Sequence, residues 1–180
     1  QPVALSVRDH REVAMSLHVR NGTSLRRALA LWWHYNNELV THLYSRPTVL
    51  LDFASSLADP AGAVQALAQL IQGERFDVTP DSQDAAAATV RPSLKRQRIT
   101  RLDGTAERLA RDLDEHLAIL QGAHGGEVPR TLPPAPDWTR EALDELTEFW
   151  SMVVERDIAL AQAQQPGVGR RLARRLSGKG

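Results

Sequence analysis

The stretch that decides the fold is VALSVRDHREVAMSL, residues 3–17. Its first five residues form a short apolar run that stops at Arg8, as a buried parallel strand does before a helix. Asp9 is the expected N-cap of that helix, Glu12 stands at the capping-box spacing, and Gly22 ends it. The stretch therefore predicts a strand-turn-helix unit, which is the building block of α/β folds.

A second strand follows after a long helix. Thr23 or Ser24 can cap that helix, whose apolar stripe runs through about Tyr44 and consists of Leu25, Leu29, Trp32, Leu39 and Leu43. The run TVLLDF, residues 48–53, reads as a buried strand, and Asp59-Pro60 opens another helix. Two strands separated by helices predict a parallel sheet, which needs cover on both faces and neighbouring strands. We expect a helix-rich α/β chain with a truncated parallel sheet.

The rest of the chain reads as helical. Thr79-Pro80 opens an Ala-rich helix, and the stripe Ala106, Leu109, Leu113, Leu117 and Leu120 predicts one helix that ends near Gly122. A second stripe, Leu143, Leu146, Trp150, Val153 and Val154, predicts a long helix. The predicted regions are therefore residues 1–122, a Gly- and Pro-rich connection at 123–138, the long helix at 139–165 and a basic, solvated tail at 166–180.

Composition excludes several classes of function. The chain of 180 residues carries 22 Lys and Arg against 22 Asp and Glu, so no overall field favours nucleic acid or a membrane surface. It has no cysteine, which excludes disulfides, thiolate metal sites and cysteine nucleophiles. No apolar run approaches the roughly 20 residues that span a bilayer, and the start lacks the features of a signal peptide. We expect a soluble, cytoplasmic protein without a transmembrane segment.

The first stretch also carries the best candidates for ligand binding. Arg8 stands at the carboxyl end of a predicted strand, where ligands of open α/β sheets bind, and Ser16 lies two turns into the next helix. The arginine fork and a hydroxyl on the same side make a plausible phosphate clamp. The alternative is that Arg8 pairs with a nearby carboxylate and Ser16 merely fills the helix surface. Spacing alone leaves both readings open.

These residues resemble a known family. VRDHREVAMSL is similar to the segment with which bacterial sulfotransferases that use 3'-phosphoadenosine 5'-phosphosulfate (PAPS) bind the 3'-phosphate: Arg-Asp-Pro, a spacer, then Ser. Arg8 and Ser16 match both ligands, while His10 stands where the family usually has Pro. The likeness continues through ALALWWHYNNEL, VLLDFASSLADP and VRPSLKRQR, and covers about Val3 to Arg98.

The resemblance implies the C-terminal part of a P-loop-type sulfotransferase fold. Such an enzyme moves a sulfuryl group from PAPS to a hydroxyl or amine of a glycan, lipid or small metabolite. Arg8 and Ser16 would hold PAPS or its product, 3'-phosphoadenosine 5'-phosphate (PAP). The family's 5'-phosphosulfate loop and catalytic residue are expected upstream of Gln1, in the N-terminal half of the same protein. We therefore assign no catalytic residue and expect this chain alone to be inactive.

The second helix carries two further candidate sites. Trp33, Tyr35 and Asn36 suit an acceptor pocket, because aromatic faces suit sugars or flat substrates and an amide can hold a hydroxyl. On the same helix His34, Glu38 and His42 recur every four residues. They would span about 12 Å along the axis, which is too far for one ion to reach all three. A solvated polar face is favoured, and we predict no metal.

A second interpretation assigns the chain to a different functional class, that of interaction modules. The chain can be a non-catalytic helical interaction module, derived from this fold or unrelated to it, which buries its strands and the Leu143 to Val154 stripe against a partner. The missing phosphosulfate loop motivates this alternative, and self-association stays open under either reading.

Overall fold

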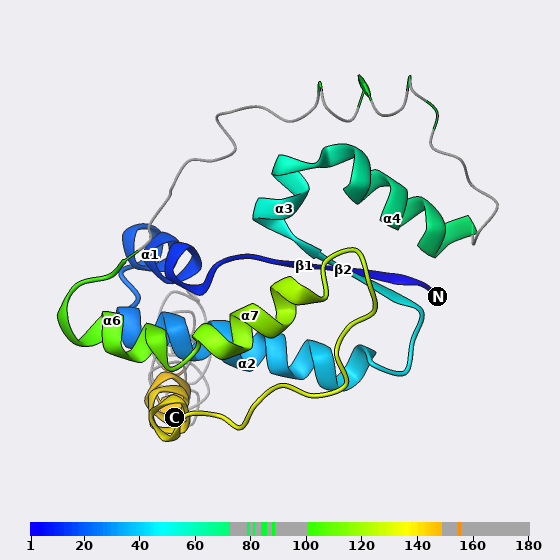
Figure 1. Ribbon diagram of the computed structural model, residues 1–180. Coiled ribbons are helices and arrows are strands. Elements are labelled where there is room, and N and C mark those ends of the chain that lie inside the picture. Colours follow the sequence, from blue (N-terminus) through cyan, green and yellow to red (C-terminus); the bar gives the residue numbers. More distant parts are fainter. Residues whose placement is uncertain are drawn as a thin grey trace, which may run out of the picture. The chain divides into compact units, whose positions relative to one another are not determined.

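The computed structural model describes residues 1–72, 79, 81, 84, 85, 88, 101–148 and 155. The chain divides into two units, Gln1–Ala142 and Leu143–Gly180, and the first contains the sheet. The described elements are, in order, β1 (Val3–Val7), α1 (His10–Asn21), α2 (Leu25–Leu43), β2 (Thr48–Asp52), α3 (Phe53–Ala58), α4 (Pro60–Gln72), α6 (Gly104–Arg111) and α7 (Asp114–Gly122) (Figure 1). Residues 137–148 are also helical. The predicted helix-rich α/β class is confirmed.

The sheet consists of two parallel strands. Val3 pairs with Thr48 and Val7 with Asp52, so the carboxyl ends of β1 and β2 lie side by side. The far edge of β2 is paired as well, because the Leu50 amide donates to the Gly126 carbonyl at 2.9 Å and the Leu50 carbonyl accepts from the Gly125 amide at 2.8 Å. In the part of the chain that the structure describes, β1 has β2 as its strand neighbour and nothing on its other edge.

The outer edge of β1 is formed by Ala4 and Ser6. The Val3 amide donates to the Pro47 carbonyl at 3.0 Å, so Val3, and with it every second residue of the strand, points its backbone toward β2. The backbone groups of Ala4 and Ser6 consequently point away from β2, and both residues are exposed. No described residue hydrogen-bonds to them. Within Val3–Val7 this open edge lacks proline, charge and bulge, the usual devices that block strand addition, although Pro2 directly precedes it.

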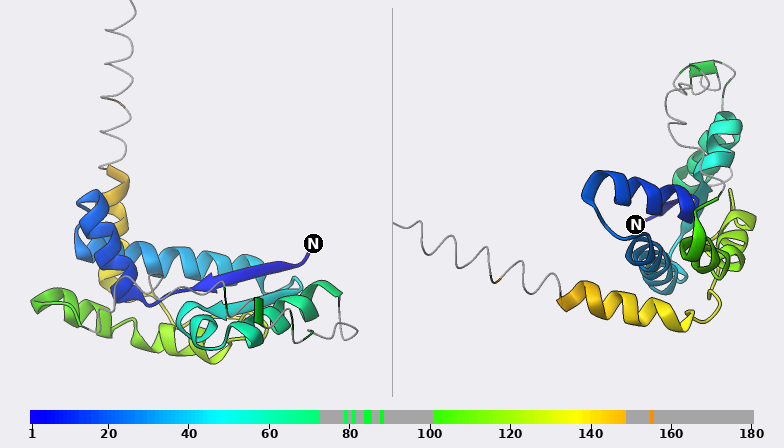
Figure 2. Two further views of the ribbon diagram at one scale, coloured as in Figure 1. Left: turned by 90° about the horizontal axis from the view of Figure 1, so that it is seen from above. Right: turned by 90° about the vertical axis from the view of Figure 1, so that its left-hand side faces the viewer.

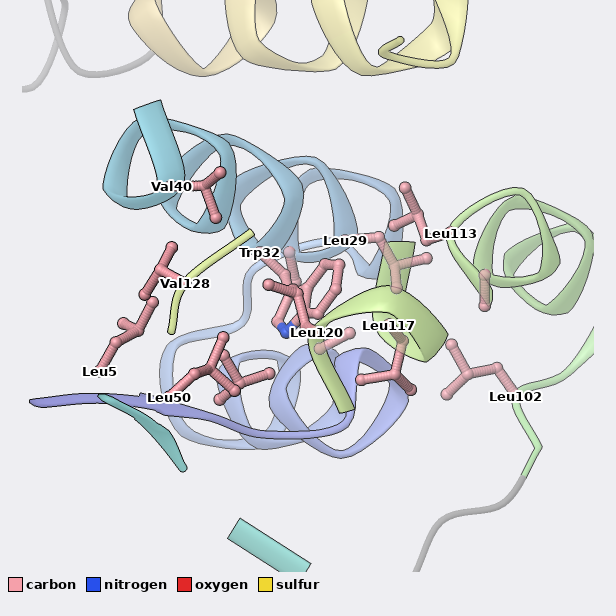
Figure 3. Close-up of a cluster of buried hydrophobic side chains, with 14 residues drawn as sticks. Leu5, Leu29, Trp32, Val40, Leu50, Leu102, Leu113, Leu117, Leu120 and Val128 are labelled. Carbon is pink, nitrogen blue, oxygen red and sulfur yellow. The ribbon is translucent and has the colours of Figure 1, made fainter. Parts of the chain in front are cut away.

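The core lies between the sheet and the helices α1, α2 and α7. Leu5 and Leu50 project from the paired strands, and Leu29, Trp32 and Leu120 meet them from α2 and α7 (Figure 3). Leu29, Leu50 and Leu120 are fully buried, and each such side chain contributes about 1.5–3 kcal/mol. In Figures 1 and 2, α3 and α4 lie away from this core, and both contact β2. This packing holds the carboxyl ends of β1 and β2 in place.

Two sequence predictions need correction. The single helix predicted to run from Ala106 to Gly122 is two helices, α6 and α7, which are separated at Asp112 and Leu113. The Asp112 carboxylate at this break accepts from the Trp138 indole at 3.0 Å, so a partner distant in sequence stabilises it. Phe53 is not part of β2 but begins α3, because the Asp52 carboxylate accepts the Ser55 amide at 2.8 Å and caps a helix there.

Some predictions concern residues that the structure describes only in part. Of the Ala-rich helix predicted after Pro80, residues 81, 84, 85 and 88 are described, and these are helical. The long helix predicted at 139–165 begins at residue 137 and is described through 148. The segment VRPSLKRQR, the stripe from Trp150 to Val154 and the basic tail lie outside the described residues.

Candidate functional site

Arg8 lies at the carboxyl end of β1, as the sequence predicted. Because Val7 and Asp52 are in register, the residues that follow them, Arg8 and Phe53, leave the sheet side by side. The Arg8 guanidinium carbon lies 4.9 Å from the centre of the Phe53 ring, a cation–π contact. Two segments distant in sequence therefore meet where parallel sheets usually bind ligands.

The Arg8 guanidinium is held at one edge and one face. Its Nε donates to Glu12 Oε2 at 2.8 Å, and the Arg8 side chain remains 33% exposed. Within the described residues, neither terminal nitrogen of Arg8 has a hydrogen-bond acceptor. The Arg8 carbonyl accepts from the Trp32 indole at 2.8 Å, so its backbone is anchored to α2. The two terminal nitrogens, which form the end-on fork of the guanidinium, thus remain available to a ligand.

Ser16 lies on the same side of α1 as Glu12. Side chains four residues apart share a helix face, so Glu12 and Ser16 lie on one face of α1, and Glu12 contacts Arg8, which precedes the helix. Ser16 is half-buried, and no described residue hydrogen-bonds to its hydroxyl. Ser16 lies one helical turn, about 5.4 Å, beyond Glu12 along α1, and Arg8 contacts Glu12 from the end of β1. The alternative from the sequence, in which Arg8 pairs with a nearby carboxylate, agrees with the Arg8–Glu12 contact. That contact occupies Nε of the guanidinium and leaves its two terminal nitrogens without an acceptor among the described residues.

The start of α1 shows why Glu12 is free to hold Arg8. The Asp9 carboxylate caps the helix by accepting the backbone amides of Arg11 at 2.7 Å and Glu12 at 3.2 Å. The Glu12 side chain was expected to complete a capping box with Asp9. That expectation is wrong, because its carboxylate pairs with Arg8 instead.

A polar cluster, formed by the buried His10, Arg11 and Glu107 and the half-exposed Asp114, stands beside the site. Arg11 is 8% exposed and donates to both oxygens of Glu107, at 3.2 and 3.3 Å, and to both oxygens of Asp114, at 2.6 and 3.2 Å. The guanidinium lowers the pKa of Glu107 to about 2, and the two carboxylates raise the pKa of Arg11. The cluster ties α1 to α6 and α7. Local sequence patterns do not reveal it, because its partners stand about a hundred positions apart.

His10 completes this cluster with an uncharged ring. It is fully buried, its ring centre lies 5.3 Å from that of Trp32, and its Nε2 lies 2.9 Å from Arg11 Nη1. Burial lowers the pKa of His10. A neutral ring whose Nε2 accepts from Arg11 fits this contact and leaves a buried Nδ1–H that has no hydrogen-bond partner among the described residues. The His10 side chain thus packs the turn between β1 and α1 against α2.

Asp52 closes the neighbouring strand end without leaving a ligand site. It is 2% exposed, and its Oδ2 accepts both the Ser55 amide at 2.8 Å and the Ser55 hydroxyl at 2.7 Å. The Asp52 amide donates to His124 Nδ1 at 3.0 Å. The Asp52 carboxylate therefore caps α3, and the Asp52 backbone amide joins β2 to the segment after α7.

The predicted acceptor residues lie in three different environments. Trp33 is half-buried at the edge of the core, Asn36 is buried and donates to the Trp32 carbonyl at 2.7 Å, and Tyr35 is 61% exposed. At 100° per residue, Trp33 and Asn36 lie on neighbouring faces of α2 and Tyr35 lies opposite Trp33. The helix does not bring all three together.

The polar face of α2 is paired internally. His42 Nε2 lies 3.2 Å from Glu38 Oε2, with both side chains largely exposed, whereas His34 packs against the Tyr35 ring, 5.7 Å between centres. Within the described ranges, no group of three or more His, Asp or Glu side chains is arranged to hold a metal ion.

Comparison of the chain with protein-family models, curated proteins and solved structures found no match. Among the helices that the structure describes, none combines the length and apolar character required to cross a membrane. The interpretation of the site therefore depends on its own geometry.

Proposed function

We propose that this chain forms the part of a PAPS-dependent sulfotransferase that binds the 3'-phosphate of the cofactor. Arg8 and Ser16 are the proposed ligands. The observation that carries the proposal is the end-on fork of Arg8, which has no acceptor among the described residues and lies at the carboxyl end of a parallel strand. An arginine fork matches phosphate oxygens in a bidentate contact.

The proposed reaction divides the work between two parts of the enzyme. PAPS supplies a sulfuryl group that passes in line to a hydroxyl or amine, and such a transfer depends on positioned cations and amides around the moving group. In this chain, Arg8 and Ser16 would bind and orient the nucleotide at its 3' side. Of the three residues expected at the acceptor wall, Tyr35 is exposed and remains a candidate, whereas Asn36 is buried and its amide donates to the Trp32 carbonyl.

The proposal requires a partner segment that carries the 5'-phosphosulfate loop. The N-terminal half of the same protein is the proposed source. The open edge of β1 supports this, because the backbone groups of Ala4 and Ser6 point away from β2 and can accept a further strand. A strand added there would end beside Arg8 if it ran parallel to β1.

Nucleotide titration of the full-length protein tests the proposal. PAP and AMP differ in the 3'-phosphate, so the ratio of their affinities isolates the contact assigned to Arg8. We expect Arg8→Ala to weaken PAP binding at least tenfold, since a hydrogen bond to a charged group contributes about 1.5–3 kcal/mol, and to leave AMP binding unchanged. Ser16→Ala should weaken PAP binding less.

The matched control is Arg46→Ala. Arg46 is an exposed arginine that precedes the amino end of β2, at the opposite end of the sheet. Its removal changes net charge as Arg8→Ala does but should leave PAP binding unchanged. Equal PAP affinities of the wild type and Arg8→Ala would show that the assignment is wrong.

The same open edge favours a second candidate, an interaction module that binds a partner's strand at β1. Ser6→Pro removes an outward amide of β1 and should abolish such binding, because proline cannot donate to a strand ladder. A stable monomer in sedimentation that binds no hydrophobic dye would count against this module.

A further inference from the structure

We infer that Phe53 and Glu12 are positioning residues for Arg8, which together set the plane and the direction of its end-on fork. The inference rests on the proposed function, since it assigns the fork to the 3'-phosphate. Local sequence patterns place neither residue in the site. Both act through Arg8 and need no contact with the ligand.

Phe53 provides the platform for the guanidinium. It is the first residue after β2 and is half-buried, and its ring centre lies 4.9 Å from the Arg8 guanidinium carbon. The register of Val7 with Asp52 places this ring beside Arg8, and the capping of α3 by Asp52 fixes the backbone from which it projects. The guanidinium carbon of Arg8 thus lies over a ring that is supplied by α3.

Glu12 determines the rotation of the guanidinium within that plane. Its Oε2 accepts from Arg8 Nε at 2.8 Å, and the Glu12 side chain is 19% exposed. A contact at Nε leaves one N–H of each terminal nitrogen, the pair that forms the end-on fork, directed away from Glu12. Because ordering a long side chain opposes binding, an arginine held at one face and one edge binds an anion more tightly than a freely rotating one.

The carboxylate of Glu12 also repels a bound phosphate, so its two effects must be separated. Glu12→Gln and Glu12→Ala both remove the charge, but glutamine retains an oxygen that can accept from Arg8 Nε. A positioning role therefore predicts a difference between the two variants. A role through charge alone predicts none.

The first experiment is titration of the full-length protein with PAP and AMP. We expect Phe53→Leu, which keeps the charge and the apolar character, to lower the preference for PAP over AMP roughly two- to fivefold, the size of an exposed cation–π contact. Phe53→Tyr retains a ring and should restore the wild-type preference. Glu12→Gln should bind PAP roughly two- to tenfold more tightly than Glu12→Ala, which corresponds to ordering one long side chain.

A second experiment needs no nucleotide and separates this inference from the proposed function. The NMR signal of the Arg8 Nε–H group, assigned by its loss in Arg8→Lys, should report an ordered side chain in the wild type and Phe53→Tyr. In Phe53→Leu and Glu12→Ala it should report fast motion. Failure of the wild type to bind PAP, with these NMR differences present, would overturn the proposed function and leave the positioning of Arg8 established. An Arg8 signal that is equally mobile in all variants would overturn the positioning roles, as would equal PAP affinities of Glu12→Gln and Glu12→Ala.

Discussion

Arg8 and Arg11 stand three residues apart, at the end of β1 and the start of α1, yet their surroundings differ in kind. Arg11 is buried, and its guanidinium donates to four carboxylate oxygens of Glu107 and Asp114. Arg8 is one-third exposed, donates from its Nε to Glu12 and covers the ring of Phe53. Within the described residues, one arginine has its guanidinium bound to carboxylates on both sides and the other keeps its fork free.

The difference separates an arginine that holds the fold from one that can hold a ligand. A charge buried among carboxylates contributes little net stability, but removing it leaves those carboxylates without a partner. An exposed pair contributes little in either direction, so its residues can be committed to binding. The geometry of the Arg8 fork then depends on the Arg11 cluster, which fixes α1 against α6 and α7.

The largest expected effect is the loss of folding stability caused by Arg11→Met. Removing the guanidinium that pairs with the Glu107 and Asp114 carboxylates should lower the free energy of unfolding more than any substitution in a partly exposed ion pair does. Arg8→Met, the matched substitution at the exposed position, should lower it by less than about 1 kcal/mol. Urea-induced unfolding followed by circular dichroism measures both. Similar losses in the two variants would remove the distinction drawn between these arginines.

The second expected effect is a dependence of stability on pH. Arg11 holds the pKa of Glu107 at about 2 in the folded protein, below its ordinary value of 4.5. The unfolded chain therefore takes up this proton at higher pH than the folded chain. The stabilisation is fully present above pH 4.5 and is lost as the pH falls toward 2.

Unfolding free energies measured across that range test this prediction, with Arg11→Met as the control. Without the guanidinium, the pKa of Glu107 should rise toward its ordinary value, so the loss of stability below pH 4.5 should become shallower. An unchanged slope in Arg11→Met would mean that other carboxylates cause the acid sensitivity.

The smallest expected effect is the change in folding stability caused by Glu12→Gln. The Arg8–Glu12 pair is partly exposed, so losing its charge should change the free energy of unfolding by no more than about 0.5 kcal/mol. The same urea titration measures it. A loss as large as that of Arg11→Met would show that Glu12 holds the fold rather than Arg8.

Local patterns predicted the elements that surround the site. The apolar runs predicted β1 and β2, Asp9 and Ser24 cap α1 and α2 as expected, and Gly22 ends α1 in the left-handed conformation, with φ at 68°. Trp32 lies in the core, as its helical stripe required. These features depend on interactions between residues close in sequence, which is why pattern alone could predict them.

The contacts that define the site could not be predicted in this way. The sequence pattern predicts Phe53 as the last residue of a strand, but the Asp52 cap starts a helix there. The pattern also predicts Glu12 as part of a capping box, but its carboxylate accepts from Arg8. At the break between α6 and α7, Asp112 likewise accepts from Trp138, which lies far along the chain. In each case a contact made in the folded chain overrides the preference that the pattern alone indicates.

The sequence by itself determined which segments become strands and helices and placed Arg8 at the end of a strand, because backbone preferences and apolar periodicity act over a few residues. The tertiary structure decided which of the two arginines, Arg8 or Arg11, has terminal nitrogens without a carboxylate partner among the described residues. Glu107 and Asp114 reach Arg11 from α6 and α7, and the register of β1 with β2 delivers Phe53 to Arg8. The surroundings of each guanidinium depend on partners that folding, rather than the local sequence, brings within a few ångströms of it.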